Sequence, residues 1–197
     1  MLRKIKYHSF AFAKVNLTLR ILSKLKYGYH RIQSFIIFLN LKDEIQLIES
    51  DLRYDKIIFK GKFSRGINKK NSIFQLLNLL DEKKILRNKK FKISVKKNIP
   101  LKSGMGGGSM NVACILKFLV KKNFLKVKEA ELFAKKIGSD VILGLNNSPK
   151  ILLSNGQIIE IKKKIKYSVL LIKPQFGCST KEIFQNNTSF SKRKYFK

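Results

Sequence analysis

The chain has 197 residues and a formal net charge of +31, from 43 Lys and Arg against 12 Asp and Glu. Its apolar fraction of 44% is ordinary for a globular protein, which excludes a largely disordered chain. No apolar run reaches the roughly 18 residues of a membrane helix, and the first residues lack the apolar stretch of a secretory signal. We therefore expect a cytoplasmic globular protein with no membrane partner, of one domain or one domain plus a fragment of a second.

The positive charge has two interpretations. Neutralisation of phosphates is the usual use of such an excess, so a basic nucleic-acid-binding protein is one hypothesis. However, 36 of the 43 basic residues are Lys, which lacks the bidentate geometry of Arg. Lys, Ile, Asn and Phe, which are all abundant here, share codons rich in A and T. The surplus is thus explained by a compositional background, and no specific nucleic acid is expected.

The predicted elements alternate between strands and helices. Alternating apolar residues predict strands over residues 10–22, 32–40, 44–49, 57–59 and 91–97. Helical spacing predicts helices over residues 71–81, 109–120 and 128–137, the first with Asn71 as its N-cap. Short strands follow near residues 150–153, 157–161 and 167–173. The mixture predicts an α+β fold.

The glycine-rich segment between the strand at 91–97 and the helix at 109–120 is the most informative part of the sequence. It runs Pro-Leu-Lys-Ser-Gly-Met-Gly-Gly-Gly-Ser from Pro100 to Ser109. Glycines let the backbone approach a ligand, and the amides of a helix N-terminus attract anions. The Gly-Lys-Ser/Thr ending of a Walker A loop is missing. The order of strand, glycines, Ser and helix favours phosphate binding over a flexible loop.

Four segments resemble motifs of the GHMP kinase family, and they follow one another along the chain in the order that the family has. Pro100 to Asn111 is similar to its phosphate loop, and Ala13-Lys14-Val15-Asn16-Leu17 to its N-terminal motif. Gly28-Tyr29-His30 and Gly138-Ser139-Asp140-Val141 resemble two further motifs, and the triple glycine is typical of the 4-diphosphocytidyl-2-C-methyl-D-erythritol kinase branch. The resemblance covers about residues 11–184. It implies the GHMP kinase fold, whose N-terminal domain is similar to the second domain of ribosomal protein S5.

The resemblance also implies a reaction. Members of this branch transfer a phosphoryl group from ATP to the 2-hydroxyl of a CDP-linked methylerythritol, a step of non-mevalonate isoprenoid (terpenoid) biosynthesis. It assigns Asp140 as the general base that accepts the hydroxyl proton. Lys14 would keep Asp140 ionised and stabilise the developing alkoxide. A charge inside the apolar strand at 10–22 would otherwise be costly.

Binding residues follow from the same resemblance. Asn71 and Lys97 are expected near adenine, and the hydroxyl of Ser109 near a magnesium ion. Asn16 is expected on the substrate, with Tyr29, His30 and Phe184 around its cytosine ring. The loop residues expected to bind ATP phosphates are Pro100, Leu101, Lys102, Ser103, Gly104, Met105, Gly106, Gly107, Gly108 and Ser109.

The sequence also departs from the family pattern. Lys102 and Ser103 stand where small residues, often Gly, are usual. The chain is shorter than the family, and the third glycine-rich motif has no counterpart. We expect an ATP-binding domain over residues 1–162, and a truncated remnant of the C-terminal α+β domain with a basic tail over residues 163–197. Such a remnant would leave apolar surface that self-association could cover. The alternative hypothesis is a decayed kinase that binds nucleotide without turnover.

Overall fold

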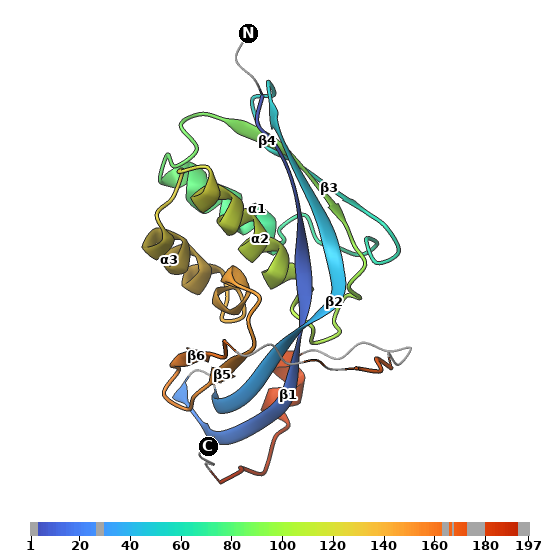
Figure 1. Ribbon diagram of the computed structural model, residues 1–197, viewed down its shortest axis with the longest axis vertical. Coiled ribbons are helices and arrows are strands. Elements are labelled where there is room, and N and C mark those ends of the chain that lie inside the picture. Colours follow the sequence, from blue (N-terminus) through green and yellow to red (C-terminus); the bar gives the residue numbers. More distant parts are fainter. Residues whose placement is uncertain (1–3, 27–29, 163–165, 167, 173–179, 193–197) are drawn as a thin grey trace. The chain divides into compact units, whose positions relative to one another are not determined.

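The computed structural model describes residues 4–26, 30–162, 166, 168–172 and 180–192 (Figure 1). The chain divides into two compact units. The first unit consists of Met1–Ala13, Asn40–Pro100 and Gly106–Asn146, and the second of Lys14–Leu39, Leu101–Met105 and Asn147–Lys197. Within the described part of the chain, no helix has the length and apolar character needed to cross a bilayer.

The sheet of the first unit combines antiparallel and parallel pairing. Two long strands, β1 (Lys6–Lys24) and β2 (His30–Ser50), pair with each other and contribute residues to both units. In the first unit β4 (Lys90–Lys96) pairs antiparallel with β2, with Glu44 opposite Lys96. Beside it, β3 (Lys56–Lys60) runs parallel to β4. Every second residue of these strands therefore points to the same face of the sheet.

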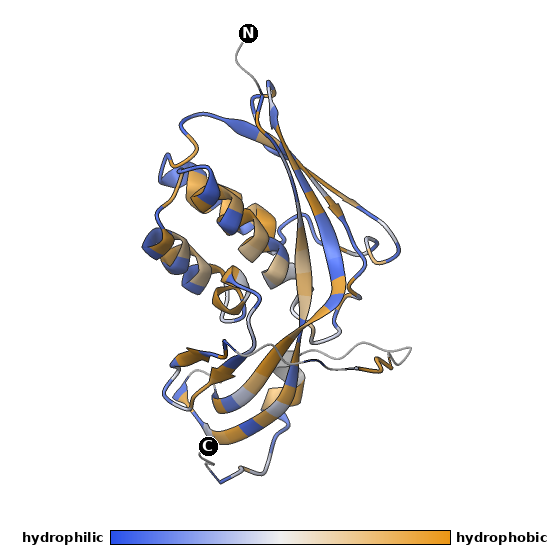
Figure 2. Ribbon diagram, viewed as in Figure 1, coloured by the Kyte–Doolittle hydropathy of each residue, from blue (hydrophilic) through white to orange (hydrophobic). Residues whose placement is uncertain are grey.

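Helices cover one face of this sheet (Figure 1). They are α1 (Ser72–Glu82), α2 (Gly107–Lys121) and α3 (Val127–Ile137), followed by the short 3-10 helix η2 (Ile142–Leu145). Hydrophilic and hydrophobic residues form separate bands along α1 and α3, as expected for helices with one buried side (Figure 2). The core between helices and sheet is fully apolar at its centre, where Ile45, Ile93 and Phe118 are completely buried.

The second unit holds a small antiparallel arrangement. Strand β5 (Lys150–Leu152) pairs with β2 residues 34–36, and β6 (Ile158–Glu160) pairs with β5. The short helix α4 (Thr180–Gln185) also belongs to this unit.

Most predicted elements are confirmed. The α+β class is correct, and the three predicted helices correspond to α1, α2 and α3, with Asn71 capping α1 through its side chain. The predicted break between residues 40 and 44 is wrong, because β2 continues through it. Asp43, which lies within the predicted break, is buried and paired (see below). The strand predicted over 167–173 is also wrong at its described residues 168–172, which form neither strand nor helix.

Gly144 in η2 lies close against helix α2. A Cβ at this position would lie 2.7 Å from the Cβ of Ala113 and 2.8 Å from the sulfur of Met110, both on α2. Contacts this short cannot be relieved by rotating the side chains alone. The packing of η2 on α2 therefore requires glycine here.

We expect Gly144→Ala to destabilise the protein by about 1–3 kcal/mol through overpacking. Chemical denaturation monitored by circular dichroism would measure this. Gly138→Ala is the matched control, because its added Cβ would meet nothing nearer than 3.9 Å and its φ of 171° is extended backbone. Equal stabilities of the two variants would contradict the packing argument.

Candidate active site

The glycine-rich loop turns by adopting the left-handed region at alternate positions. Lys102, Gly104 and Gly106 have φ values of 52°, 71° and 66°. Glycine adopts such values without steric cost, whereas a residue with a Cβ does so at a cost of about 1–2 kcal/mol. Lys102, which stands where the family usually has a small residue, thus occupies a position whose backbone conformation suits glycine. The binding of phosphate by this loop stays a prediction.

Helix α2 begins at the end of this loop with its first turn uncapped by any side chain. Its N-cap is Gly106, whose carbonyl accepts the amide of Met110 at 2.8 Å. The first turn contains no acidic residue. Amides at a helix N-terminus together with the helix dipole attract an anion. This end of α2 is therefore suited to phosphate.

The two glycines of the first turn lie against neighbouring residues. A Cβ on Gly107 would come within 3.1 Å of Ile99 Cγ2 and 3.2 Å of Lys97 Nζ, and one on Gly108 within 3.2 Å of Ser72 Oγ. The carbonyl of Gly108 accepts a hydrogen bond from Ser72 Oγ at 3.3 Å. These positions hold glycine because there is little room for a side chain between α2, the end of β4 and the start of α1.

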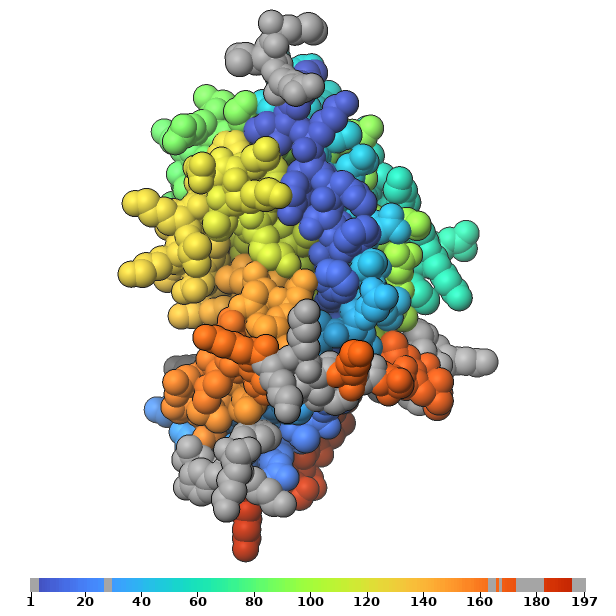
Figure 3. All heavy atoms as spheres, viewed as in Figure 1, coloured from blue at the N-terminus to red at the C-terminus, as the bar shows by residue number. Residues whose placement is uncertain are grey.

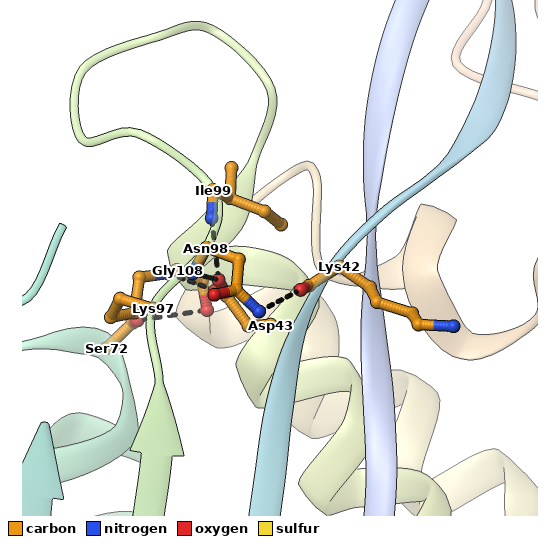
Figure 4. A network of polar contacts seen from close by, with 7 residues as sticks. All are labelled: Lys42, Asp43, Ser72, Lys97, Asn98, Ile99 and Gly108. Atoms are coloured by element: carbon orange, nitrogen blue, oxygen red, sulfur yellow. Dashed lines mark hydrogen bonds and ion pairs between the residues drawn. The ribbon is translucent and has the colours of Figure 1, made fainter. Parts of the chain in front are cut away.

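A buried ion pair supports the start of the loop (Figure 4). The Lys97 ammonium pairs with the Asp43 carboxylate, and these residues are 2% and 0% exposed. The other oxygen of Asp43 accepts the backbone amides of Asn98 and Ile99, each at 2.8 Å. Asp43 therefore holds both the side chain of Lys97 and the backbone that leads into Pro100.

Asp43 is the structural residue that the sequence interpretation missed. Its position within a strand of alternating apolar residues could have indicated its role, because a buried charge is tolerated there only with a partner. Its partner Lys97 lies 54 positions further along the chain, so the sequence did not indicate the pairing. Lys97 was expected near adenine, and its ammonium is instead engaged with Asp43. A role of Lys97 toward ATP stays a prediction.

Asn71 is similarly engaged. Its Oδ1 accepts the amides of Ile73 and Phe74, at 3.0 and 3.2 Å. Its Nδ2 donates to the carbonyls of residues 68 and 69, at 3.0 and 3.2 Å. A contact between this side chain and adenine would have to share these atoms. The role of Asn71 near adenine stays a prediction.

The two residues expected to perform catalysis are placed in different units. Lys14 in β1 is 6% exposed, and its backbone amide donates to the carbonyl of Met105 at 3.1 Å, which joins β1 to the glycine loop within the second unit. Asp140 is half-buried in the turn between α3 and η2 of the first unit. Their pairing, and the role of half-buried Asn16, stay predictions.

Two of the three residues expected at the cytosine ring come together. The rings of His30 and Phe184 have centroids 5.3 Å apart and planes tilted by 33°. Rings at this distance contact each other directly, so a base would stack on the pair or separate it. Tyr29, and Gly28 before it, lie outside the described residues.

The residues present fit a nucleotide phosphate with its magnesium ion. Besides the uncapped helix end, the Oδ1 of Asn111 on α2 is a buried acceptor without a hydrogen-bond partner, and the residue is 2% exposed. An unpaired buried amide oxygen costs about 1–3 kcal/mol. No cluster of three His, Cys, Asp or Glu occurs among the described residues. Magnesium bound with ATP needs few protein ligands, because phosphates and water supply the others.

The cysteine on α2 takes no part in this chemistry. Cys114 is completely buried, and burial raises the pKa of its thiol. A protonated, buried thiol is a poor nucleophile. Cys178 lies outside the described residues.

Comparison with known proteins identifies the family. The family model described as "GHMP kinases N terminal domain" matches residues 71–164. A 4-diphosphocytidyl-2-C-methyl-D-erythritol kinase from Pelagibacter ubique is 49% identical over 187 residues, which are 94% of this chain and 66% of the relative. One from Pseudothermotoga lettingae is 32% identical over 189 residues, which are 94% of this chain and 67% of the relative. The chain belongs to the 4-diphosphocytidyl-2-C-methyl-D-erythritol kinase family.

The fold agrees with this family. A crystal structure of a 4-(cytidine 5'-diphospho)-2C-methyl-D-erythritol kinase aligns with a TM-score of 0.64 at 23% identity, covering 79% of this chain and 55% of the other. The GHMP kinase fold expected from the motifs is thus confirmed. The chain spans about two thirds of the length of the curated kinases that it matches.

The backbone that leads into the glycine-rich loop is expected to depend on the negative charge of Asp43. We expect Asp43→Asn to destabilise the protein by about 3–5 kcal/mol, because it leaves the Lys97 ammonium buried without its counter-ion. Urea denaturation would measure the loss.

Two controls make this result specific. Glu44→Gln removes the next carboxylate of the same strand, whose bond to Lys96 at 2.9 Å is solvent-exposed, and should change stability little. Asp43→Leu combined with Lys97→Met removes both charges and should recover only part of the loss, because the amides of Asn98 and Ile99 still lose their acceptor. If Asp43→Asn were no more harmful than Glu44→Gln, the buried pair would not support the loop.

Proposed function

We propose that the chain is an ATP-dependent kinase that phosphorylates the 2-hydroxyl of 4-diphosphocytidyl-2-C-methyl-D-erythritol, a step of non-mevalonate isoprenoid biosynthesis. The observation that carries the proposal is the uncapped, glycine-lined start of α2 in a chain of this family. Kinases of this kind act mainly by positioning and by electrostatic stabilisation. The proposed nucleotide site therefore accounts for the largest part of the chemistry.

Residues 106–109 would hold the phosphates of ATP through backbone amides, and Ser109 would contribute a hydroxyl oxygen to magnesium. Bound ATP with magnesium supplies the phosphoryl group and neutralises its charge. Residues 100–105 would shape the approach of the loop. Asn71 and Lys97 would act near adenine, the former through the start of α1 that it caps.

Asp140 would accept the proton of the attacking hydroxyl, since a carboxylate within hydrogen-bond reach can act as general base. Lys14 would stabilise the oxyanion that develops, because an ammonium in a buried setting acts strongly on nearby charge. Asn16, two positions along the same strand, would project from the same strand face and bond the substrate.

The cytidine end of the substrate would meet His30 and Phe184. Support comes from the direct contact of their rings, because an aromatic pair offers a flat base a stacking surface worth about 1–3 kcal/mol. Tyr29 would complete this subsite.

The domain organisation is part of the proposal. Residues 1–162 would form the ATP-binding domain, in line with the family model that ends at residue 164. Residues 163–197 would begin the C-terminal domain of the relatives.

Replacement of the proposed base tests the function. Asp140→Asn should lower kcat by at least about 100-fold, because general-base catalysis contributes 10²–10⁴. Phosphorylation of the CDP-linked substrate would be measured with radiolabelled ATP. Asp51→Asn is the control, since this carboxylate is 84% exposed and pairs with Lys4 at the surface. Equal rates for wild type and Asp140→Asn would reject Asp140 as base.

The same preparation separates an active enzyme from a nucleotide-binding protein without turnover. The second candidate rests on the start of α2, whose amides would bind phosphate whether or not transfer follows. Binding of a fluorescent ATP analogue should be equal in wild type and Asp140→Asn. Binding with no turnover in the wild type would select the second candidate, whereas turnover above background would reject it.

We also propose that copies of this 197-residue chain associate through residues 169–172. Leu170 and Ile172 are each 84% exposed, and Val169 and Leu171 add apolar surface beside them. Exposed apolar patches of this kind mark interaction sites. Sedimentation velocity should find a dimer or larger species, which Leu170→Lys combined with Ile172→Lys converts to monomer. A monomeric wild type would reject the association.

A further inference from the structure

The sheet of the first unit has a second face, opposite the helices. On β1, Tyr7 packs on Phe118 of α2 with ring centroids 4.9 Å apart, and Ala11 is buried. Even-numbered residues of β1 therefore point away from the helices. The buried residues Ile45 of β2 and Ile93 of β4 fix the alternation of those strands in the same way.

We call this surface the open face. The strand registers of β2, β3 and β4 place its members on one side of the sheet. Its residues are Lys6, His8, Phe10, Phe12, Lys42, Glu44, Gln46, Ile48, Lys56, Ile58, Lys60, Lys92, Ser94 and Lys96. In Figure 3 the dark blue atoms of β1 lie at the surface beside those of β2.

Like charges lie directly opposite each other on the open face. In the parallel pairing of β3 and β4, Lys56 is the partner of Lys92 and Lys60 is the partner of Lys96. Directly opposed like charges destabilise a sheet. Glu44 accepts a hydrogen bond from Lys96 at 2.9 Å and offsets one of the pairs. The arrangement is one that a polyanion would stabilise.

Aromatic rings form a row on β1, on the same face of the sheet and separated from these lysines by β2. His8, Phe10 and Phe12 follow one another along β1, with centroids 5.1 Å and 6.4 Å apart. The Lys42 ammonium lies 4.4 Å from the Phe10 centroid and 5.3 Å from that of Phe12. Aromatic rings on a sheet, with cations around them, form a surface on which unpaired bases stack.

A hollow of about 470 Å³ lies between His8 and the lysine pair of Lys60 and Lys96. His8, Gln46, Ser94, Lys60 and Lys96 line it together with Glu44, Ile45 and Gly61. These side chains offer donors to phosphate oxygens and both donors and acceptors to base edges and ribose hydroxyls. The hollow is large enough for a nucleotide.

We propose that the open face binds single-stranded nucleic acid. Phosphates would lie along the lysines of β3 and β4, and bases would stack along His8, Phe10 and Phe12. A high Lys content explains a large net charge, but it does not explain aromatic rings in a row on the same face of the sheet as two opposed lysine pairs. A duplex would present its phosphates with its bases hidden, and an acidic protein segment would leave the rings unused. This function is independent of the proposed kinase activity.

Binding of a fluorescein-labelled 12-nucleotide oligouridine RNA to the full chain, followed by anisotropy at several salt concentrations, tests the proposal. Lys60→Glu combined with Lys92→Glu should weaken binding about tenfold and lower the salt slope by about 2, since two phosphate contacts are lost. Lys128→Glu combined with Lys135→Glu is the matched control, because it changes the net charge equally at exposed positions of α3. We expect less than a twofold change from it.

Three outcomes overturn the proposal. Equal losses from the two double variants would mean that the chain acts only as a general polycation. Equal affinity for a 12-base-pair duplex and for the single strand would exclude base stacking. An unchanged affinity in Phe10→Leu combined with Phe12→Leu, folded by circular dichroism, would exclude the ring row. An oligothymidine DNA of the same length has bases and phosphates but lacks the ribose hydroxyl. Its affinity therefore distinguishes binding through bases and phosphates from a requirement for ribose.

Stability measurements test the repulsion between the opposed lysines separately from RNA binding. Lys60→Glu combined with Lys92→Glu places opposite charges across from Lys96 and Lys56, so its Tm should rise by about 1–3 °C while RNA binding falls. A variant that lost binding because it unfolded would show a lower Tm. Oligouridine should raise the Tm of the wild type and not that of this variant; equal increases would also overturn the proposal.

Discussion

The buried ion pair of Asp43 and Lys97 is the interaction on which the proposed phosphate site depends. Two charges removed from water lose hydration that their mutual attraction alone barely recovers. The pair is tolerable because Asp43 also accepts two backbone amides, those of Asn98 and Ile99. These bonds fix the backbone where it leaves β4, immediately before the loop. The same pair leaves little room at 107, since a Cβ there would lie 3.2 Å from the Lys97 ammonium.

Local signals in the sequence predicted the helices and the loop, whereas long-range pairing determined what was missed. Asn71 could be assigned as a cap because a cap bonds to amides two and three residues away. The conformations of Gly104 and Gly106 follow from glycine itself. The role of Asp43 was missed, because the cation that makes it compatible with a strand lies 54 positions away. No local pattern encodes such a partner.

The same distinction applies to the positive charge. Composition explains how many lysines the chain has, but strand register determines which of them share a surface. Lys56 and Lys60 are separated from Lys92 and Lys96 by more than 30 positions, and parallel pairing brings them opposite each other. The charge that composition could treat as background thus has a defined geometry on one face of the sheet. It would also attract ATP and a CDP-linked substrate, since both are polyanions.

Nucleotide binding and turnover make different demands on this chain. The amides that would hold phosphate lie at the start of α2, and their support by Asp43 and Lys97 is complete within the first unit. The proposed substrate residues Lys14, His30 and Phe184 belong to the second unit. Phosphoryl transfer requires the two sets in one productive geometry, whereas binding of a phosphate at the start of α2 requires only the first set. A chain that spans two thirds of its relatives can therefore keep its nucleotide site intact whatever its rate of transfer, so affinity for ATP alone is no measure of catalysis.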